Sequence, residues 1–166
     1  MRAAHPTVAE LTDLYGLEPL PEEGGLFRRT WAGPDLPDGH PAGSAIVVLL
    51  TADGDHFSAL HRLPTDEIWH FYLGDPVQLL LLGASARTVA LGPGVLDGQY
   101  VQFTVPAGTW MGGAVADGGD WALMGCTMAP GFHPDDYEGG DAEELSARYP
   151  EVRKHIRSLC RARNAR

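Results

Sequence analysis

Cysteine is scarce in this chain. Only Cys126 and Cys160 occur among the 166 residues, and they do not form a CxxC pair. Two isolated cysteines exclude a disulfide framework and a zinc knuckle, since both need more thiols at short spacings. A reduced and therefore cytoplasmic protein is the expectation.

Basic residues and long apolar runs are also few. Twelve lysines and arginines face 22 aspartates and glutamates, which gives a formal net charge of −10. This charge argues against nucleic acid and against an anionic membrane as partners, because both would repel the protein. No apolar run approaches the roughly 20 residues that a membrane-spanning helix needs, and the N-terminus lacks the apolar stretch of a signal peptide.

What the chain does contain is β-type sequence from residue 44 to residue 130. Gly, Pro and Asp separate short runs at a spacing of about 8–12 residues, which is typical of an all-β sandwich or barrel. Periodicity alone leaves sandwich and closed barrel open. The eight runs are residues 45–51, 56–63, 67–73, 77–82, 87–91, 100–105, 109–115 and 121–128.

Two of these runs, residues 46–50 and 79–82, are apolar on both faces. Strands of this kind are covered on both sides. We expect the interior of the barrel on one side and a dimer partner on the other.

The N-terminal part predicts a helix, a strand and a loop. Thr7 and Glu10 form a capping box that begins a short helix over residues 7–16. Residues 26–31 are typical of a strand. Residues 33–43 carry three prolines and three glycines and therefore predict a loop.

The C-terminal part changes from strands to helices. Asp141 can cap a helix over residues 142–149, and Pro150 suits the first turn of a last helix. The final residues 161–166 are basic and predict a solvated terminus. We expect a single domain over residues 1–166, with a β-barrel core at about 26–130 and a helical extension at about 141–162.

Residues 53–75 hold three of the seven histidines and carry most of the chemistry. Side chains along a strand alternate between two faces, and residues 64–66 are a short turn. A hairpin at this turn would bring His61 and Glu67 to one apolar face. Such a pair is either a metal site, an acid/base pair for catalysis, or a buried pair of side chains that satisfy each other's hydrogen bonds.

The same residues resemble the cupin motifs. His61, Glu67 and Gly74 stand at the spacing of the first motif, and residues 106–110 fit the second. Leu63 and Met111 stand where each motif has a further histidine.

The chain resembles the cupin subfamily DUF985, also called cupin_5, more closely. The shared stretches include Glu23-Gly24-Gly25, Phe-Ser-Ala-Leu-His-Arg at 57–62, Asp-Glu-Ile-Trp-His-Phe-Tyr at 66–72, and Gly-Asp-Trp-Ala-Leu-Met-Gly-Cys-Thr at 119–127. The resemblance implies a cupin double-stranded β-helix, a jelly-roll barrel with a small-molecule pocket in its mouth. It also implies a homodimer.

A metal-dependent site is one alternative. Metal cupins offer three histidines and a glutamate, and this mixture suits iron, manganese, nickel or zinc. Here only His61 and Glu67 remain as ligands, and two ligands rarely hold a divalent ion. We therefore expect no cofactor, and a divalent metal on these two residues stays an open alternative.

Metal-free acid/base chemistry is the favoured interpretation. His61 would act as the base, and Glu67 would fix its tautomer. Sugar-nucleotide epimerases of the cupin superfamily are similar in working without a metal. A proton donor would be needed on the opposite side of the substrate, and the candidates are Tyr72, Tyr100 and Tyr137.

A binding module is the third interpretation. An apolar barrel face with a few polar groups suits a small ligand with polar edges. Arg28 would pair with a carboxylate or phosphate of the ligand, or else with one of the chain's own acids. The predicted ligand-binding residues are Arg28, Phe57, Trp69, Phe71, Gln102, Thr109 and Met111.

The sequence thus predicts a small-molecule-binding jelly-roll protein. The favoured function is an enzyme of epimerase or isomerase type that acts on a small polar or sugar-like substrate through His61 and Glu67. The alternative is a non-catalytic binding or sensor protein that uses the same pocket. Cys126 is expected to be a small buried hydrophobe, with a role in the pocket left open.

Overall fold

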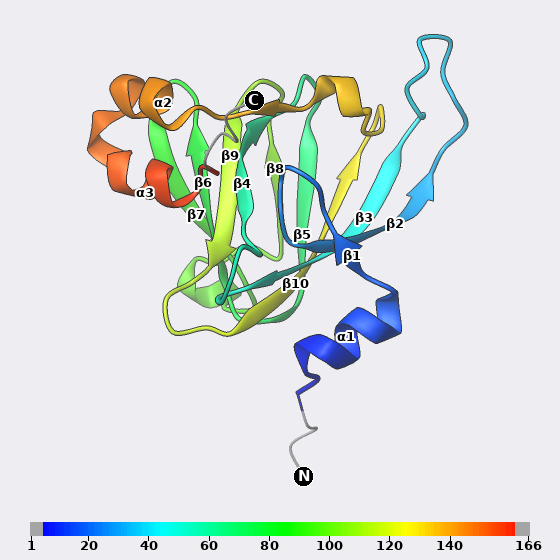
Figure 1. Ribbon diagram of the computed structural model, residues 1–166, viewed down its shortest axis with the longest axis horizontal. Helices are drawn as coiled ribbons and strands as arrows, with labels where there is room; N and C mark the ends of the chain where they lie inside the picture. Colours follow the sequence, from blue (N-terminus) through cyan, green and yellow to red (C-terminus); the bar gives the residue numbers. More distant parts are fainter. Residues whose placement is uncertain (1–4, 162–166) are drawn as a thin grey trace.

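The computed structural model describes residues 5–161 and consists mainly of two antiparallel sheets (Figure 1). One sheet has the strand order β1-β2-β3-β10-β5-β8, and the other has the order β11-β4-β9-β6-β7. The predicted all-β jelly-roll architecture is therefore confirmed. The strands are β1 (Glu18–Pro19), β2 (Leu26–Ala32), β3 (Ser44–Thr51), β4 (Ser58–Arg62), β5 (Glu67–Gly74), β6 (Val77–Leu82), β7 (Ala86–Leu91), β8 (Gln102–Val105), β9 (Trp110–Val115), β10 (Trp121–Met128) and β11 (Glu138–Gly139).

The eight strands expected between residues 44 and 130 are all present, and so is the strand expected at 26–31. The short strands β1 and β11 were not predicted, because two residues are too few to show a period. The basic tail predicted for residues 161–166 lies outside the described residues except for Arg161.

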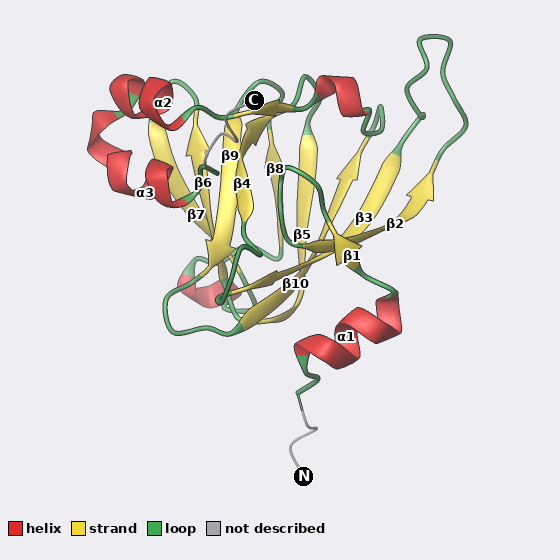
Figure 2. Ribbon diagram, viewed as in Figure 1, coloured by secondary structure: helices red, strands yellow, loops and turns green. Residues whose placement is uncertain are grey.

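The helices lie on the outer sides of the sheets (Figure 2). Thr7 and Glu10 form the expected capping box at the start of the first helix, and Gly16 ends it in the left-handed conformation. Asp141 caps the second helix as predicted. The predicted last helix begins as a 3-10 turn at Pro150 and becomes α-helical at Arg153. The helices are α1 (Val8–Tyr15), α2 (Ala142–Arg148) and α3 (Arg153–Ser158), with 3-10 turns η1 (Val95–Asp97), η2 (Pro134–Asp136) and η3 (Pro150–Val152).

The core has a layer between the sheets and further layers beneath the helices. Alternate residues of β3 and β6, such as Val48 and Leu79, fill the interior cluster between the sheets. The intervening Leu49 packs with residues of α1, and Leu80 packs with residues of α2 and α3. Helices of the same chain thus pack on these outer faces, where a dimer partner was expected, and the homodimer itself stays a prediction.

The predicted hairpin at residues 64–66 was also wrong. β4 belongs to the five-stranded sheet and β5 to the six-stranded sheet, so the turn crosses from one sheet to the other. His61 and Glu67 nevertheless both point into the interior, from opposite walls, and both are buried. Two strands that are neighbours in sequence need not pair in a jelly roll.

The loop between β2 and β3 projects beyond the end of the barrel (Figure 1, top right). Its returning arm is held to the segment after β10: the Gly131 amide donates to the Pro41 carbonyl at 2.7 Å, and His40 Nε2 lies 2.8 Å from Asp136 Oδ2. Among residues 5–161, no helix is long and apolar enough to cross a membrane.

Candidate functional site

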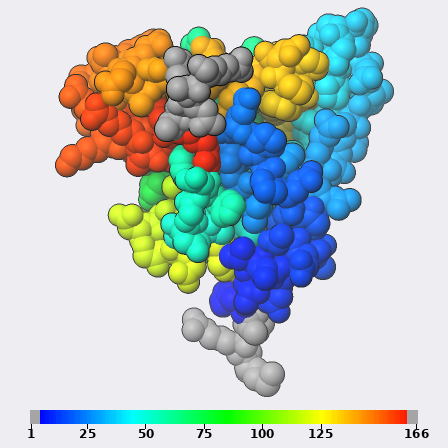
Figure 3. Space-filling view, in the orientation of Figure 1, coloured from blue at the N-terminus to red at the C-terminus, as the bar shows by residue number. Residues whose placement is uncertain are grey.

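A cavity of about 860 Å³ opens at one side of the barrel. Its walls come from the N-terminal segment, from β2, β3, β5 and β10, from the turn after β4, and from the segment after β10. In Figure 3 the N-terminal segment (blue) and the segment near residue 130 (gold) lie on the face toward the viewer. The lining residues are Gly16, Glu18, Leu20, Pro21, Glu22, Glu23, Phe27, Arg28, Arg29, Ser44, Ile46, Leu63, Glu67, Cys126, Met128, Phe132, Pro134 and Tyr137.

Glu67 is the titratable group most strongly affected by its surroundings. Only 6% of the residue is exposed, and Trp69 Nε1 donates to its Oε2 at 3.0 Å. Burial, and then the charge of Glu23, raise the pKa of the carboxyl to about 7, while the charge of His61 opposes the rise. The carboxyl therefore exchanges its proton near neutral pH.

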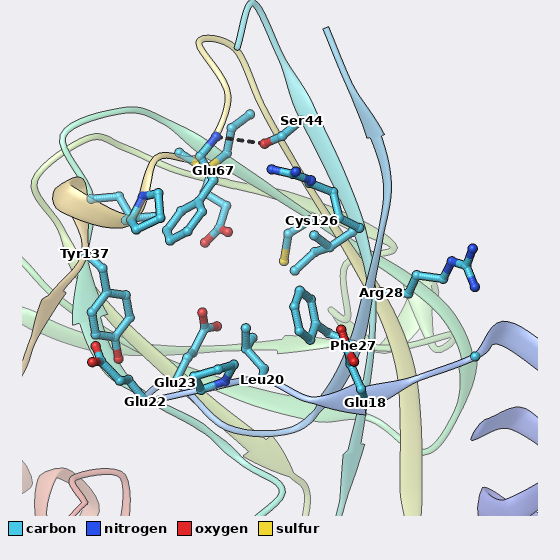
Figure 4. Close-up of a pocket in the computed structure, with 18 residues that line it drawn as sticks. Glu18, Leu20, Glu22, Glu23, Phe27, Arg28, Ser44, Glu67, Cys126 and Tyr137 are labelled. Carbon is cyan, nitrogen blue, oxygen red and sulfur yellow. Dashed lines mark hydrogen bonds between the residues drawn. The ribbon is translucent and has the colours of Figure 1, made fainter. Parts of the chain in front are cut away.

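Glu23 supplies a second carboxylate, which the sequence did not indicate. Figure 4 shows the side chains of Glu23 and Glu67 pointing toward each other from opposite sides of the cavity. Ser58 Oγ donates to Glu23 Oε1 at 2.9 Å. The Glu23 carbonyl accepts from the Ala59 amide at 2.8 Å, so both the side chain and the main chain are fixed to β4 and its start.

The turn that delivers Glu23 depends on glycine. Gly24 has φ of +97° and Gly25 has φ of +83°, and a Cβ on Gly24 would lie 2.5 Å from the Phe57 carbonyl oxygen. Only glycine adopts this conformation at so close an approach. The Glu-Gly-Gly triplet was visible in the sequence, but its irregular backbone has no period from which the direction of Glu23 could be predicted.

His61 stands behind Glu23, and it is not among the residues that line the cavity. Its Nδ1 donates to the Ala59 carbonyl at 2.7 Å, which leaves Nε2 as the acceptor of a neutral ring. Nε2 is buried without a hydrogen-bond partner within the described part of the chain, and it lies 3.8 Å from Glu23 Oε1. The ring stacks on Tyr137 with centroids 5.3 Å apart. His61 thus contacts Glu23 and Tyr137 rather than the cavity itself, and its charge also affects Glu67.

Cys126 and Tyr137 complete the wall around the two carboxylates. The Cys126 thiol lies in the cavity lining beside Glu67, and burial with that carboxylate raises the pKa of the thiol well above its usual range. Burial also raises the pKa of Tyr137. Both groups are therefore neutral at physiological pH, and neither is an activated nucleophile.

A family model described as Cupin superfamily (DUF985) matches residues 9–139. The chain belongs to this family. A search of curated proteins finds no match.

Solved structures agree with the fold. A hypothetical protein from Leishmania major is 30% identical, with a TM-score of 0.84, and the alignment covers 95% of this chain and 100% of that one. A protein from Shewanella oneidensis is 29% identical, with a TM-score of 0.85 over 95% and 99% of the two chains. Oxalate decarboxylase from Bacillus subtilis, which has Mn(II) centres, is 15% identical at a TM-score of 0.53, over 86% of this chain and 37% of that one. At that identity the likeness shows the fold alone.

The donor set does not fit the metal of other cupins. Leu63 lines the cavity and Met111 is buried opposite His61 on β9, so two motif positions for histidine carry apolar side chains. Within residues 5–161 no group of three or more His, Cys, Asp or Glu side chains is placed to hold a metal ion. A metal on His61 and Glu67 would have too few ligands, so we assign no chemical step to one.

The predicted ligand-binding residues divide into three sets. Arg28 lines the cavity. Trp69, Phe71 and Met111 pack in or against the interior cluster, as the strand phase predicted, although they are not among the lining residues.

Phe57, Gln102 and Thr109 lie elsewhere, and their predicted placement was wrong. Phe57 precedes β4, so strand alternation does not apply to it, and it packs against the cluster beneath α2 and α3. Gln102 is exposed because its neighbour Phe103 occupies the interior face of β8. Thr109 likewise precedes its strand, β9.

Proposed function

We propose that this cupin is a metal-independent proton-transfer enzyme of epimerase or isomerase type that acts on a small polar or sugar-like molecule. The observation that supports this most is the pair of carboxyl groups, Glu67 and Glu23, that point into one cavity from opposite sides (Figure 4). A general acid or base works best when its pKa lies near the working pH, and the pKa of Glu67 is raised to about 7.

The proposed reaction moves one proton on and one proton off a carbon next to a carbonyl group. The Glu23 carboxylate removes the proton from one face of that carbon, and the electron pair passes to the carbonyl oxygen. Protonated Glu67 then delivers its proton to the opposite face as the electron pair returns from the oxygen, which inverts the carbon. Where that carbon carries a hydroxyl group, Glu67 can instead protonate the former carbonyl carbon while the hydroxyl proton passes to the former carbonyl oxygen, which moves the carbonyl. The enzyme ends with Glu23 protonated and Glu67 ionised, so the reverse reaction begins from that state.

His61 becomes a positioning residue in this proposal. Its ring is fixed by the Ala59 carbonyl, and its acceptor nitrogen faces Glu23 at 3.8 Å. The fixed ring therefore acts on the Glu23 carboxyl from behind, by packing and by the electrostatic effect of this nitrogen. The predicted role of His61 as the base itself is not carried forward, because the imidazole does not line the cavity.

Solvent exchange measured by proton NMR in D₂O tests the proposal. We expect deuterium to enter one carbon position in a panel of six-carbon aldoses, ketoses, uronates and sugar phosphates. Glu67→Gln and Glu23→Gln should each slow this exchange about 100-fold or more, the range for loss of a general acid or base. Glu151→Gln, which removes an exposed carboxylate of η3, is the matched control and should leave the rate unchanged.

His61→Gln separates positioning from catalysis. We expect a smaller loss of rate than in either glutamate variant, together with a displaced pH profile, since the group that faces Glu23 can no longer ionise. Binding without any exchange would reject the enzyme and support the alternative, a non-catalytic binding or sensor protein.

A further inference from the structure

Arg29 lies on the cavity side of β2. Phe27 packs against the interior cluster and lines the cavity, and side chains two residues apart on a strand share a face. Arg29 therefore shares the face of Phe27, and Arg28 has the other face. Figure 4 shows Arg28 directed away from the cavity centre, and its guanidinium lies beside Gly16 at the end of α1.

The strand register supports the same placement. Arg29 pairs with Ile46 on β3, and Ile46 pairs with Cys126 on β10. Paired residues of neighbouring strands point to the same face, and both Ile46 and Cys126 line the cavity. One row across three strands thus leads from Arg29 to the thiol beside Glu67.

Arg29 has no acidic partner among residues 5–161. Three other arginines pair with carboxylates, as in the 2.6 Å contact between Arg62 Nε and Glu138. No hydrogen bond or ion pair joins the Arg29 guanidinium to any side chain in the described range of 5–161. The lining of the cavity therefore includes an unneutralised cation that offers a planar set of N–H donors.

The distance between Arg29 and the two glutamates suits a small molecule that contacts Arg29 at one end and the glutamates at the other. Adjacent strands lie about 4.8 Å apart, so two strand spacings separate the Arg29 and Cys126 backbones by about 10 Å. The arginine side chain shortens the gap that a ligand must span. A six-carbon chain with its terminal anionic group at Arg29 would place its other carbons near Glu67 and Glu23.

We propose that Arg29 binds a carboxylate or phosphate group of the substrate, so the substrate class is a small sugar acid or sugar phosphate. This inference rests on the proposed function for the identity of the site, but it concerns binding alone. The prediction that Arg28 takes this role is replaced, because the phase of the strand directs Arg28 to the opposite face.

Three matched probes test it: glucose, glucuronate and glucose 6-phosphate, titrated into the full chain by calorimetry. We expect at least one anionic sugar to bind about tenfold or more tightly than glucose, the effect of a charge-assisted hydrogen bond. Arg29→Gln should remove this preference. Arg87→Gln, which removes an exposed arginine of β7 outside the cavity lining, should retain it.

Two results would overturn the inference. One is equal binding, or no binding, of the three sugars by the natural chain. The other is an equal loss of preference in the Arg87 and Arg29 variants. If the chain prefers anionic sugars but catalyses no deuterium exchange, the proposed enzyme is rejected and the role of Arg29 is kept. If deuterium enters neutral sugars at a rate that Arg29→Gln does not change, the role of Arg29 is rejected and the proposed enzyme is kept.

Discussion

Replacing Glu67 by glutamine should make the protein more stable at alkaline pH than the natural chain. The pKa of the Glu67 carboxyl is 4.5 for an ordinary glutamate and about 7 in the folded protein. Each pKa unit corresponds to about 1.4 kcal/mol, so an ionised Glu67 costs the folded state about 3 kcal/mol. Glutamine has nearly the same size and never ionises.

The sign follows from proton binding. Below pH 4.5 both the folded and the unfolded chain keep the proton, and Glu67 has no effect on the free energy of unfolding. Between pH 4.5 and about 7 only the folded chain keeps it, so stability falls as pH rises. Above about pH 7 the penalty is complete. The stability of Glu67→Gln relative to the natural chain should therefore increase by about 2–3 kcal/mol from pH 5 to pH 8.

Urea unfolding at several pH values measures this difference. Titrations shared by both proteins cancel when the two free energies of unfolding are subtracted at each pH. Glu151→Gln controls for the loss of a carboxylate on the surface. A difference between Glu67→Gln and the natural chain that stays constant from pH 5 to pH 8 would refute the reasoning, because it would mean that Glu67 is not held in an environment that disfavours its charge.

Four further outcomes are expected. Trp69→Phe removes the N–H donor that stabilises ionised Glu67, so the pKa of Glu67, followed by carbon NMR, should rise further. Asp136→Asn should lower the pKa of His40 in an NMR titration, because the hydrogen bond and charge of Asp136 raise it; the stability that this pair contributes should be present below pH 6.5 and be lost as pH rises through the higher folded pKa. The Cys126 thiol, buried and with a raised pKa, should react with a disulfide reagent at pH 8 only after unfolding. The predicted homodimer stays a prediction, and light scattering tests it.

The strands and the first helix could be predicted because their signals are local. A period of two, punctuated by Gly, Pro and Asp, marks the strands. The Thr7–Glu10 capping box marks the start of α1 within a few residues of sequence. Such signals depend on what each side chain does to its own backbone, so they need no knowledge of the fold.

Which strands pair with each other could not be predicted from such local signals. The turn at residues 64–66 has the composition of a hairpin, yet it connects β4 to a strand of the other sheet. The same turn chemistry serves both connections, and the choice between them depends on which strands bury the most apolar surface together. For the same reason the apolar outer faces of β3 and β6 did not reveal that helices of the same chain cover them.

The residues of the candidate site likewise divide into those that local sequence signals could predict and those that depend on tertiary packing. Glu67 was predictable, because strand alternation places it on the same face as Trp69 and it stands at the glutamate position of the first cupin motif. Arg28 was predicted to bind the ligand and Arg29 was not considered, and strand phase gives two faces without showing which one is inside. Glu23 lies in a turn with two left-handed glycines, where no period applies.

The sequence by itself thus determined the strands, the capped helix, the family motifs and one of the two carboxyl groups, since each of these depends on neighbouring residues. Only the tertiary structure decided that Glu23 faces Glu67, that His61 stands behind it, and that Arg29 lies on the interior face of β2 while Arg28 is directed away from the cavity centre. These placements join residues 23, 29, 61 and 67 from separate segments. Their distances depend on how two sheets and an irregular turn pack together, which no local pattern encodes.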